Sequence, residues 1–236
     1  NTGAAMFNAL RKLGRIKGVQ RPGLGGTIPT RTGHSILIDL GANVDCRPEY
    51  LLQFAIMGSI YAQRMLNVQN PRVGLVSNGE EPGKGNQLVK DTFTLLEHSH
   101  LNFIGNVEGR GVALGEADVF VCDGFTGNIL LKTMEGVGMY LAGEFKQVFL
   151  RNAVTKLAAL AVQPGVRQLK KKMDYKETDG APLLGISMPV IKAHGSSDAL
   201  AVRSAVRQAI RYASSGIIED IAKNIPYMTV SDPEKE

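Results

Sequence analysis

SILIDLGANVDCRPEYLLQFAIMGSI, residues 35–60, contains the two patterns that decide the expected fold. Residues 35–40 form a short apolar run that ends at Gly41, as is typical of a buried strand. Apolar residues at helical spacing follow between Pro48 and Met65, and this spacing predicts a helix. A buried strand that leads directly into a helix is the repeating unit of a parallel sheet covered by helices.

The same alternation continues along the rest of the chain. Strands are predicted at residues 72–76, 101–104 and 119–122, and a strand pair or a strand plus turn at residues 183–193. Helices are predicted at residues 86–97, 126–150, 198–214 and 217–225, with Asn86 as the N-cap of the first. The sequence therefore predicts an α/β fold in which helices cover a mostly parallel sheet.

The chain is expected to form one main region with one distinct segment. Residues 1–225 are predicted to form a single α/β region, and the polar residues 226–236 a loose tail. Residues 151–173 combine the apolar centre LAALAV with flanking lysines and arginines. We expect this helical segment, broken at Pro164, to contact a membrane; the alternative is a helical hairpin whose apolar face packs in a dimer.

Composition excludes several classes of protein. At 236 residues and 44% hydrophobic, the chain can bury a core, and no apolar run approaches the length that spans a bilayer. The two cysteines, Cys46 and Cys122, provide no disulfide framework, so a reducing, cytosolic compartment is expected. The net charge of +5 fits either ordinary solubility or an anionic partner. No basic and aromatic stripe occurs, so nucleic acid is not an expected partner.

The strongest local signal is SNGEEPGKGN, residues 77–86, which follows a strand and opens a helix. Ligands of parallel sheets bind at the carboxyl ends of strands, where this loop lies. Gly79, Gly83 and Gly85 allow the backbone to approach an anion, and Lys84 adds a full positive charge. The spacing is not that of a Walker A loop, and the alternative is a polar loop with a surface lysine.

A second signal is CDGFTGNILLKT, residues 122–133, also at a strand end. Asp123 ends the strand, Gly127 permits a tight turn, and Asn128 lies near a helix start. Lys132 follows Asn128 by four residues, so both can share one helix face. The alternative is an ordinary N-cap followed by a solvated lysine.

Two shorter motifs supply further candidates. HGSSDA, residues 194–199, contains His194, which is either a general acid or a hydrogen-bonded loop histidine, and the capping residue Ser196. GNVEGR, residues 105–110, places Asn106 and Glu108 at a strand end, where either can point into the same crevice.

Other catalytic chemistries lack their sequence signatures. The four histidines lack ligand spacing with cysteine or carboxylate partners, so no metal is expected. No G-x-S-x-G elbow occurs, which argues against a serine hydrolase. Cys46 or Cys122 as a nucleophile is a weaker interpretation than a small buried hydrophobic residue.

Six segments together closely resemble the acyl-ACP:phosphate acyltransferase family (PlsX-type), in the same order and over about residues 1–225. They are LIDLGANVDCRPEYLLQFAIMGSIYA, VGLVSNGEEPGKGN, LNFIGNVEGR, ADVFVCDGFTGNILLKT, GAPLLGI and HGSSDA. The resemblance implies the two-domain architecture shared with isocitrate and isopropylmalate dehydrogenases, a homodimer, no organic cofactor, and peripheral association with the inner face of the cell membrane. It also implies a further segment before Asn1, where the chain starts without an initiator Met.

The implied reaction moves a long-chain fatty acyl group from acyl carrier protein to inorganic phosphate. Such an enzyme must orient phosphate and stabilise the oxyanion. Lys84 is expected to neutralise the phosphate or oxyanion, Asn128 to donate hydrogen bonds, and His194 to assist the departing thiolate. The remaining candidates for binding substrate or phosphate are Asn1, Gly3, Asn43, Asn78, Gly79, Gly83, Gly85, Asn86, Asn106, Glu108, Asp123, Gly127, Lys132 and Ser196.

Two other functions stay open at this point. An oxidoreductase of the same fold would need a nicotinamide site and usually a metal held by several aspartates, and the sequence contains no such aspartate cluster. A non-catalytic membrane scaffold would keep the basic and apolar segment at residues 151–173 but would need none of the glycine-rich loops.

Overall fold

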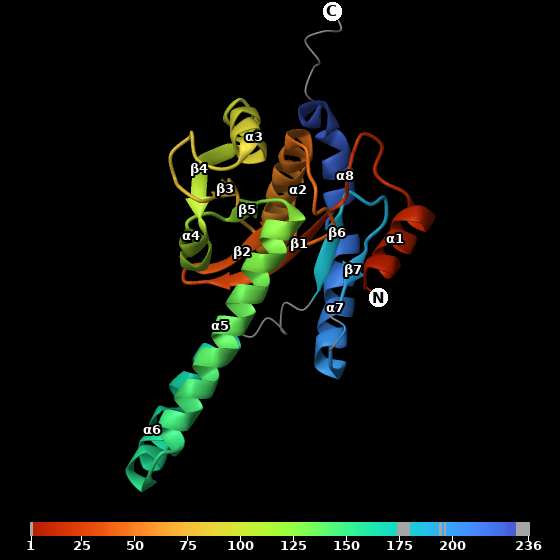
Figure 1. Ribbon diagram of the computed structural model, residues 1–236. Coiled ribbons are helices and arrows are strands. Elements are labelled where there is room, and N and C mark those ends of the chain that lie inside the picture. Colours follow the sequence, from red (N-terminus) through yellow and green to blue (C-terminus); the bar gives the residue numbers. More distant parts are fainter. Residues whose placement is uncertain (1, 174–179, 194, 196, 230–236) are drawn as a thin grey trace, which may run out of the picture.

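A seven-stranded mixed sheet forms the centre of the computed structural model, which describes residues 2–173, 180–193, 195 and 197–229 (Figure 1). The strands are β1 (Gly23–Thr30), β2 (Gly33–Ile38), β3 (Arg72–Ser77), β4 (Asn102–Glu108), β5 (Val119–Val121), β6 (Ala181–Leu184) and β7 (Ile191–Lys192). Their order is β4-β3-β5-β2-β1-β6-β7. The first four run parallel, whereas β1 is antiparallel to β2 and β6, and β7 is antiparallel to β6.

Helices cover both faces of the sheet. They are α1 (Thr2–Leu13), α2 (Pro48–Leu66), α3 (Gln87–Glu97), α4 (Gly109–Leu114), α5 (Gly124–Leu150), α6 (Ala153–Met173), α7 (Ala199–Ala213), α8 (Ile217–Lys223) and the 3-10 turn η2 (Ile225–Met228). One apolar cluster joins the sheet to α2, α3 and α8, with Phe54 and Met57 of α2 fully buried. The second cluster joins the other face to α4 and the start of α5. The chain is thus an α/β protein with helices on both sides of a mostly parallel sheet, as the sequence predicts.

The predicted elements from residue 35 onward match the structure to within a few residues. Helix α2 begins at Pro48, and Asn86 caps α3 by accepting a hydrogen bond from the backbone N–H of Val89 at 3.0 Å. Four elements were not predicted: α1, α4, β1 and η2. Strand β1 reads GLGGTIPT, and its three glycines and one proline are residues that isolated strands disfavour.

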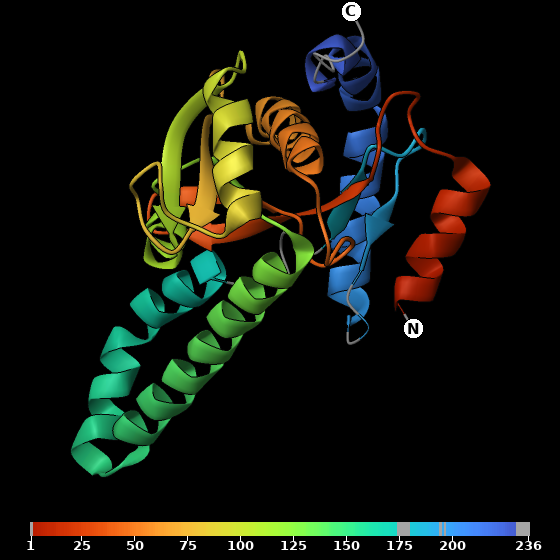
Figure 2. The ribbon, with the colours of Figure 1, turned by 45° about the horizontal axis from the view of Figure 1, so that its top comes forward.

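The predicted break at Pro164 is wrong, because α6 continues through this residue. Proline removes only one helical hydrogen bond, and the neighbouring Leu160 and Val162 are exposed, so water can reach the freed carbonyl. Helix α6 packs back along α5, and the two helices project from the body of the molecule as a hairpin (Figures 1 and 2). The expected hairpin is therefore formed by α5 with α6, not within residues 151–173.

The segment that begins at Pro226 is not loose at its start. Residues 225–228 form η2, and the Met228 side chain is fully buried. Gln53 of α2 donates a hydrogen bond to the Met228 carbonyl at 3.3 Å. The prediction of a loose tail is wrong for these residues because apolar Met228 adds to the core, and residues 230–236 lie outside the described part of the chain.

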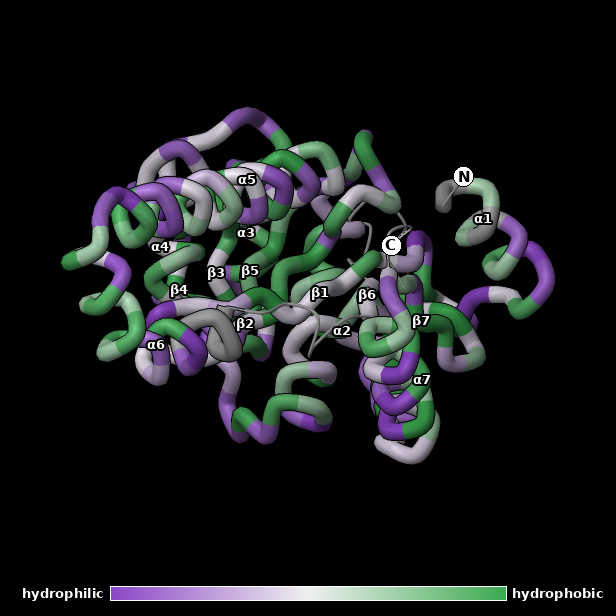
Figure 3. The backbone as a smooth tube through the Cα atoms, turned by 90° about the horizontal axis from the view of Figure 1, so that it is seen from below, coloured by the Kyte–Doolittle hydropathy of each residue, from purple (hydrophilic) through white to green (hydrophobic). Residues whose placement is uncertain are grey.

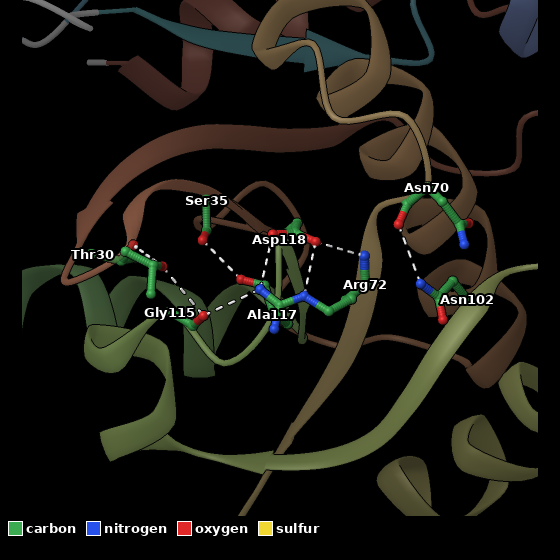
Figure 4. A network of polar contacts seen from close by, with 9 residues as sticks. Thr30, Ser35, Asn70, Arg72, Asn102, Gly115, Ala117 and Asp118 are labelled. Atoms are coloured by element: carbon green, nitrogen blue, oxygen red, sulfur yellow. Dashed lines mark hydrogen bonds and ion pairs between the residues drawn. The ribbon is translucent and has the colours of Figure 1, made fainter.

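A polar network joins the amino ends of the parallel strands (Figure 4). Arg72 at the start of β3 binds the Asp118 carboxylate through its Nε and Nη2 atoms, both at 3.1 Å, and through its backbone N–H at 2.8 Å. Ser35 donates to the Ala117 carbonyl at 2.8 Å. These contacts hold the strands in register at the edge opposite the candidate loops, so they are structural.

Candidate functional site

Four parallel strands end at one edge of the sheet, and the glycine-rich loops follow them there. The strand order puts the loop after β3 beside the end of β4, and the loop after β2 beside the start of α5, which follows β5. Because β3 and β5 are neighbours, the two pairs form adjacent halves of a single edge. This is the edge at which α/β sheets bind their ligands.

Lys84 stands on a turn that the backbone fixes in place. Its backbone N–H donates to the Glu81 carbonyl at 3.0 Å, and the Asn106 side-chain amide donates to the same oxygen at 2.8 Å. Gly79 is buried beneath the aliphatic part of the Lys84 side chain. Gly85 has φ of +98°, and a side chain there would collide with Val89 at the start of α3.

The Lys84 side chain is exposed, and it has no ion pair with any residue that the structure describes. It therefore offers an unneutralised cation beside the amino end of α3, where the helix dipole also favours an anion. Asn78 is exposed on the same loop, and Gly83 has open space around its Cα.

Two buried polar atoms beneath this loop lack a partner in the described part of the chain, namely the Ser77 hydroxyl and the Asn106 side-chain oxygen. Buried polar atoms are normally satisfied, so these atoms are positioned for water or a ligand. Ser77 was not predicted as a site residue, although a polar residue ending the apolar run of β3 was an available signal. Asn106 was predicted to bind substrate; its side-chain nitrogen supports the loop that carries Lys84, whereas its side-chain oxygen stays without a partner in the described residues.

Glu108 forms an ion pair with Arg110 at 2.9 Å, and Arg110 also lies 3.5 Å from Glu80. Arg110 was missed by the sequence reasoning. Its charge is shared between two carboxylates, so the prediction of Glu108 as a phosphate ligand finds no support in this geometry. A free carboxylate would repel phosphate, and the arginine reduces that repulsion.

Asp39 organises the other half of the edge. One oxygen of this fully buried carboxylate accepts hydrogen bonds from the backbone N–H groups of Leu24, Gly41 and Ala42 at 3.0, 3.2 and 3.0 Å. The other oxygen accepts from the Asn43 backbone at 2.7 Å and side chain at 2.8 Å. Burial raises the pKa of Asp39, and these hydrogen bonds oppose the rise. The sequence reasoning missed Asp39, because most of its role depends on donors that only folding and the turn bring together.

The backbone and the side-chain nitrogen of Asn43 are engaged within the protein. Its side-chain nitrogen donates to the Pro22 carbonyl at 2.8 Å as well as to Asp39. Its backbone carbonyl accepts a hydrogen bond from the N–H of Gly124 at 2.7 Å. The predicted binding residue Asn43 thus ties the loop after β2 to the first residue of α5.

Asp123 caps α5. Its two oxygens accept hydrogen bonds from the Thr126 N–H and hydroxyl, both at 2.8 Å. A side chain at Gly127 would overlap the Asp39 carbonyl oxygen, so glycine is required where the helix approaches the loop after β2. Asn128 in the first turn is exposed and lies beside Gly41, whereas Lys132 is paired with Glu135 at 2.6 Å.

Several candidates cannot be placed in this geometry. Asn1, His194 and Ser196 lie outside the described residues, and Gly3 lies in the first turn of α1. Burial, together with the charges of nearby Asp39 and Asp123, raises the pKa of the Cys46 thiol to about 12. Burial also raises the pKa of Cys122. Both thiols are therefore protonated at neutral pH and are poor nucleophiles.

Fold and site define an α/β protein whose glycine-rich loops and helix starts lie together at the carboxyl ends of its parallel strands. A family model described as "Fatty acid synthesis protein" matches residues 1–220. Phosphate acyltransferase of Thermoanaerobacterium thermosaccharolyticum is 52% identical over 225 residues, which are 95% of this chain and 68% of the relative. Phosphate acyltransferase of Acetivibrio thermocellus is 48% identical over 236 residues, which are 100% of this chain and 70% of the relative.

The chain belongs to the fatty acid synthesis protein family, and its resemblance to the acyl-ACP:phosphate acyltransferases is confirmed. Among solved structures, a phosphotransacetylase from Streptococcus pyogenes aligns with a TM-score of 0.46 and 18% identity. The alignment covers 59% of this chain and 48% of that one.

Proposed function

We propose that the protein is a phosphate acyltransferase that transfers a long-chain fatty acyl group from acyl carrier protein to inorganic phosphate. The carrying observation is that relatives 48–52% identical over almost the whole chain bear the name phosphate acyltransferase. The groups at this edge support the proposal. An unpaired lysine and two helix starts are suited to binding a phosphate ion, whereas covalent catalysis would need a nucleophilic triad.

In this reaction a phosphate oxygen attacks the thioester carbon, a C–O bond forms, and the C–S bond breaks. The carrier leaves as a thiolate and takes up a proton from water. A thiol with a pKa of about 8.5 is a fair leaving group, so strong general acid catalysis is not required. The enzyme must instead hold phosphate against the thioester, exclude water and stabilise the oxyanion.

Lys84 is proposed to neutralise phosphate or the oxyanion, held in place by the turn at Glu81. Asn128 and the N–H groups that begin α5 are proposed to donate hydrogen bonds from the neighbouring half of the edge. His194 is proposed to assist the departing thiolate. An oxidoreductase or a non-catalytic scaffold is less well supported, since neither accounts for relatives named as acyltransferases.

The α5–α6 hairpin is proposed to serve the dimer and the membrane. Beyond Gly127 no described side chain of α5 is fully buried, and apolar side chains such as Met139 and Phe145 of α5 and Leu157 of α6 are exposed. Such exposure in one region is typical of an interaction surface. Within the described residues, no helix has the length and apolar character to cross a bilayer. We therefore propose a cytoplasmic homodimer whose residues 151–173 contact the anionic inner face of the cell membrane peripherally.

The finer architecture is also a proposal. Residues 1–225 are proposed to be one acyltransferase region within the two-domain fold of the isocitrate and isopropylmalate dehydrogenases. The family's motifs support this relationship, and a crystal structure of the full-length protein would test it.

Product analysis tests the proposed reaction. Full-length protein is mixed with a long-chain acyl carrier protein thioester and phosphate, and the products are identified by mass spectrometry. Acyl phosphate should appear together with one equivalent of free carrier thiol. Hydrolysis to fatty acid in place of acyl phosphate, or no turnover, contradicts the proposal.

A further inference from the structure

The first 38 residues carry all of the chain's excess positive charge. Six of its 27 lysines and arginines lie there, but none of its 22 aspartates and glutamates, so the remaining residues hold 21 bases and 22 acids. Five of the six bases fall within residues 11–21, from the end of α1 into the following loop. The end of α1 is accordingly strongly hydrophilic (Figure 3). We call residues 11–21 the basic turn.

Residues of the basic turn line a hollow on the protein surface. Arg15, Lys17 and Arg21 are exposed and contribute to the lining of a hollow of about 580 Å³. None of the three takes part in an ion pair with a residue in the described part of the chain. Arg21 lies 6.0 Å from the centre of the Tyr50 ring. Three unneutralised cations around a hollow form a surface that attracts an anionic partner.

Hydrogen bonds fix the basic turn to the candidate site. Gln53 of α2 accepts from the Gln20 N–H at 2.8 Å and donates to the Gly18 carbonyl at 3.2 Å. Pro22, directly after the basic turn, accepts from the Asn43 side chain at 2.8 Å. The Asn43 carbonyl in turn binds the N–H of Gly124 at the start of α5. The basic turn is therefore rigidly connected to the edge where the thioester would react.

We infer that the basic turn is the docking surface for the acidic face of the carrier protein that delivers the acyl thioester. The inference rests on the proposed function, from which the partner follows. A membrane is a poorer match, because membrane-binding segments insert several apolar side chains, whereas the basic turn exposes Leu13 alone and buries Ile16 and Val19 in the protein. Charged partners attract each other at a distance, so such a surface increases the association rate of an acidic protein.

Charge reversal in the full-length protein tests the docking surface. Lys17→Glu with Arg21→Glu should weaken binding of acyl carrier protein at least about tenfold, measured by fluorescence anisotropy of the labelled carrier. The matched control is Arg203→Glu with Arg207→Glu, which makes the same charge change on exposed residues of α7. The control should bind within about twofold of wild type, and both variants should keep the wild-type melting temperature. Lys17→Ala, which removes a side chain without hydrogen-bond partners in the described residues, gives a milder test if the double variant does not fold.

Activity assays separate this inference from the proposed function. In the basic-turn variant the KM for acyl carrier protein should rise, while turnover of a soluble acyl-pantetheine thioester and binding to vesicles with anionic lipid should not change. Equal effects in variant and control, carrier binding as in wild type, or selective loss of vesicle binding would overturn the docking assignment. Failure of wild type to form acyl phosphate would instead refute the proposed function, and the anisotropy experiment would still decide whether an acidic carrier binds here.

Discussion

Asp39→Asn should destabilise the fold and impair the site, although the two side chains have almost the same shape. One carboxylate oxygen accepts three backbone hydrogen bonds, and an asparagine oxygen can keep these. The amide nitrogen then faces the two N–H donors of Asn43, which lie at 2.7 and 2.8 Å from the second oxygen in the native protein. Two hydrogen bonds to a charged group are replaced by a contact between donors.

The expected fall in the free energy of unfolding follows from the loss of these two hydrogen bonds. Each hydrogen bond to a charged group contributes about 1.5 to 3 kcal/mol, so their loss costs about 3 to 6 kcal/mol. Removing a buried charge returns part of this amount, because burial disfavours the carboxylate and raises its pKa. We therefore expect the free energy of unfolding to fall by about 2 to 4 kcal/mol. Since Asn43 also binds Gly124, a looser loop should shift the start of α5 and reduce turnover by about a hundredfold.

Urea denaturation gives the free energy of unfolding, and acyl phosphate formation is measured well below the melting temperature. Asp45→Asn is the matched control, because Asp45 lies exposed on the same loop without a hydrogen-bond partner in the described residues. The control should stay within about 0.5 kcal/mol of wild type. Wild-type stability in Asp39→Asn would refute the hydrogen-bond argument, and wild-type activity in the folded variant would refute the positioning role.

Three further predictions follow from other parts of the molecule. Lys84→Ala should lower kcat/KM by about 30- to 1,000-fold, or about 2 to 4 kcal/mol, without changing the melting temperature; near-normal activity contradicts its role. Burial acts to raise the pKa of Asp118, but hydrogen bonds from Arg72 lower it below 3.8. Asp118→Asn should therefore lower the free energy of unfolding by about 1 to 2 kcal/mol at neutral pH. Urea denaturation should show this difference between variant and wild type disappear as the pH falls through the lowered pKa of Asp118. Leu157→Glu with Leu160→Glu should stop flotation with anionic vesicles at low salt while light scattering still shows a dimer; retained flotation or a monomer contradicts membrane contact by this segment.

The elements that sequence reasoning found are those whose signals are local. The apolar spacing of α2 and the capping side chain of Asn86 act within a few residues of themselves, so both were predicted. Strand β1 depends instead on distant partners. A side chain at Gly23 would collide with Ile38 and Phe54, and one at Gly26 would collide with Leu40. The glycines that weaken the strand signal are thus required by packing that no local pattern reveals.

The candidate site shows the same division between local and distant information. The sequence places the glycine-rich loops after strands, because strand ends and glycines mark them, and the structure has them there. It did not distinguish side chains that bind a ligand from side chains that hold the loops. Asn43, Asn106 and Asp123 were predicted to bind substrate, and each has hydrogen-bonding groups committed to neighbouring backbone or side chains. Their partners, such as Pro22 and Glu81, become neighbours largely through folding.

Some polar side chains at this edge hold the loops, and others stay exposed. This difference bears on how an edge with buried carboxylates could accept an anion. Phosphate would be repelled by a free carboxylate, but Asp39 and Asp123 are surrounded by N–H and hydroxyl donors that offset their charge. Lys84 and Asn128 remain exposed, each near the start of a helix where the backbone favours negative charge. The two aspartates therefore shape the loops, whereas the exposed side chains on these loops include the Lys84 cation and the Asn128 amide together with the carboxylates of Glu80 and Glu81. We therefore expect the charge of Lys84, rather than the charges of the two aspartates, to face an anionic ligand at this edge.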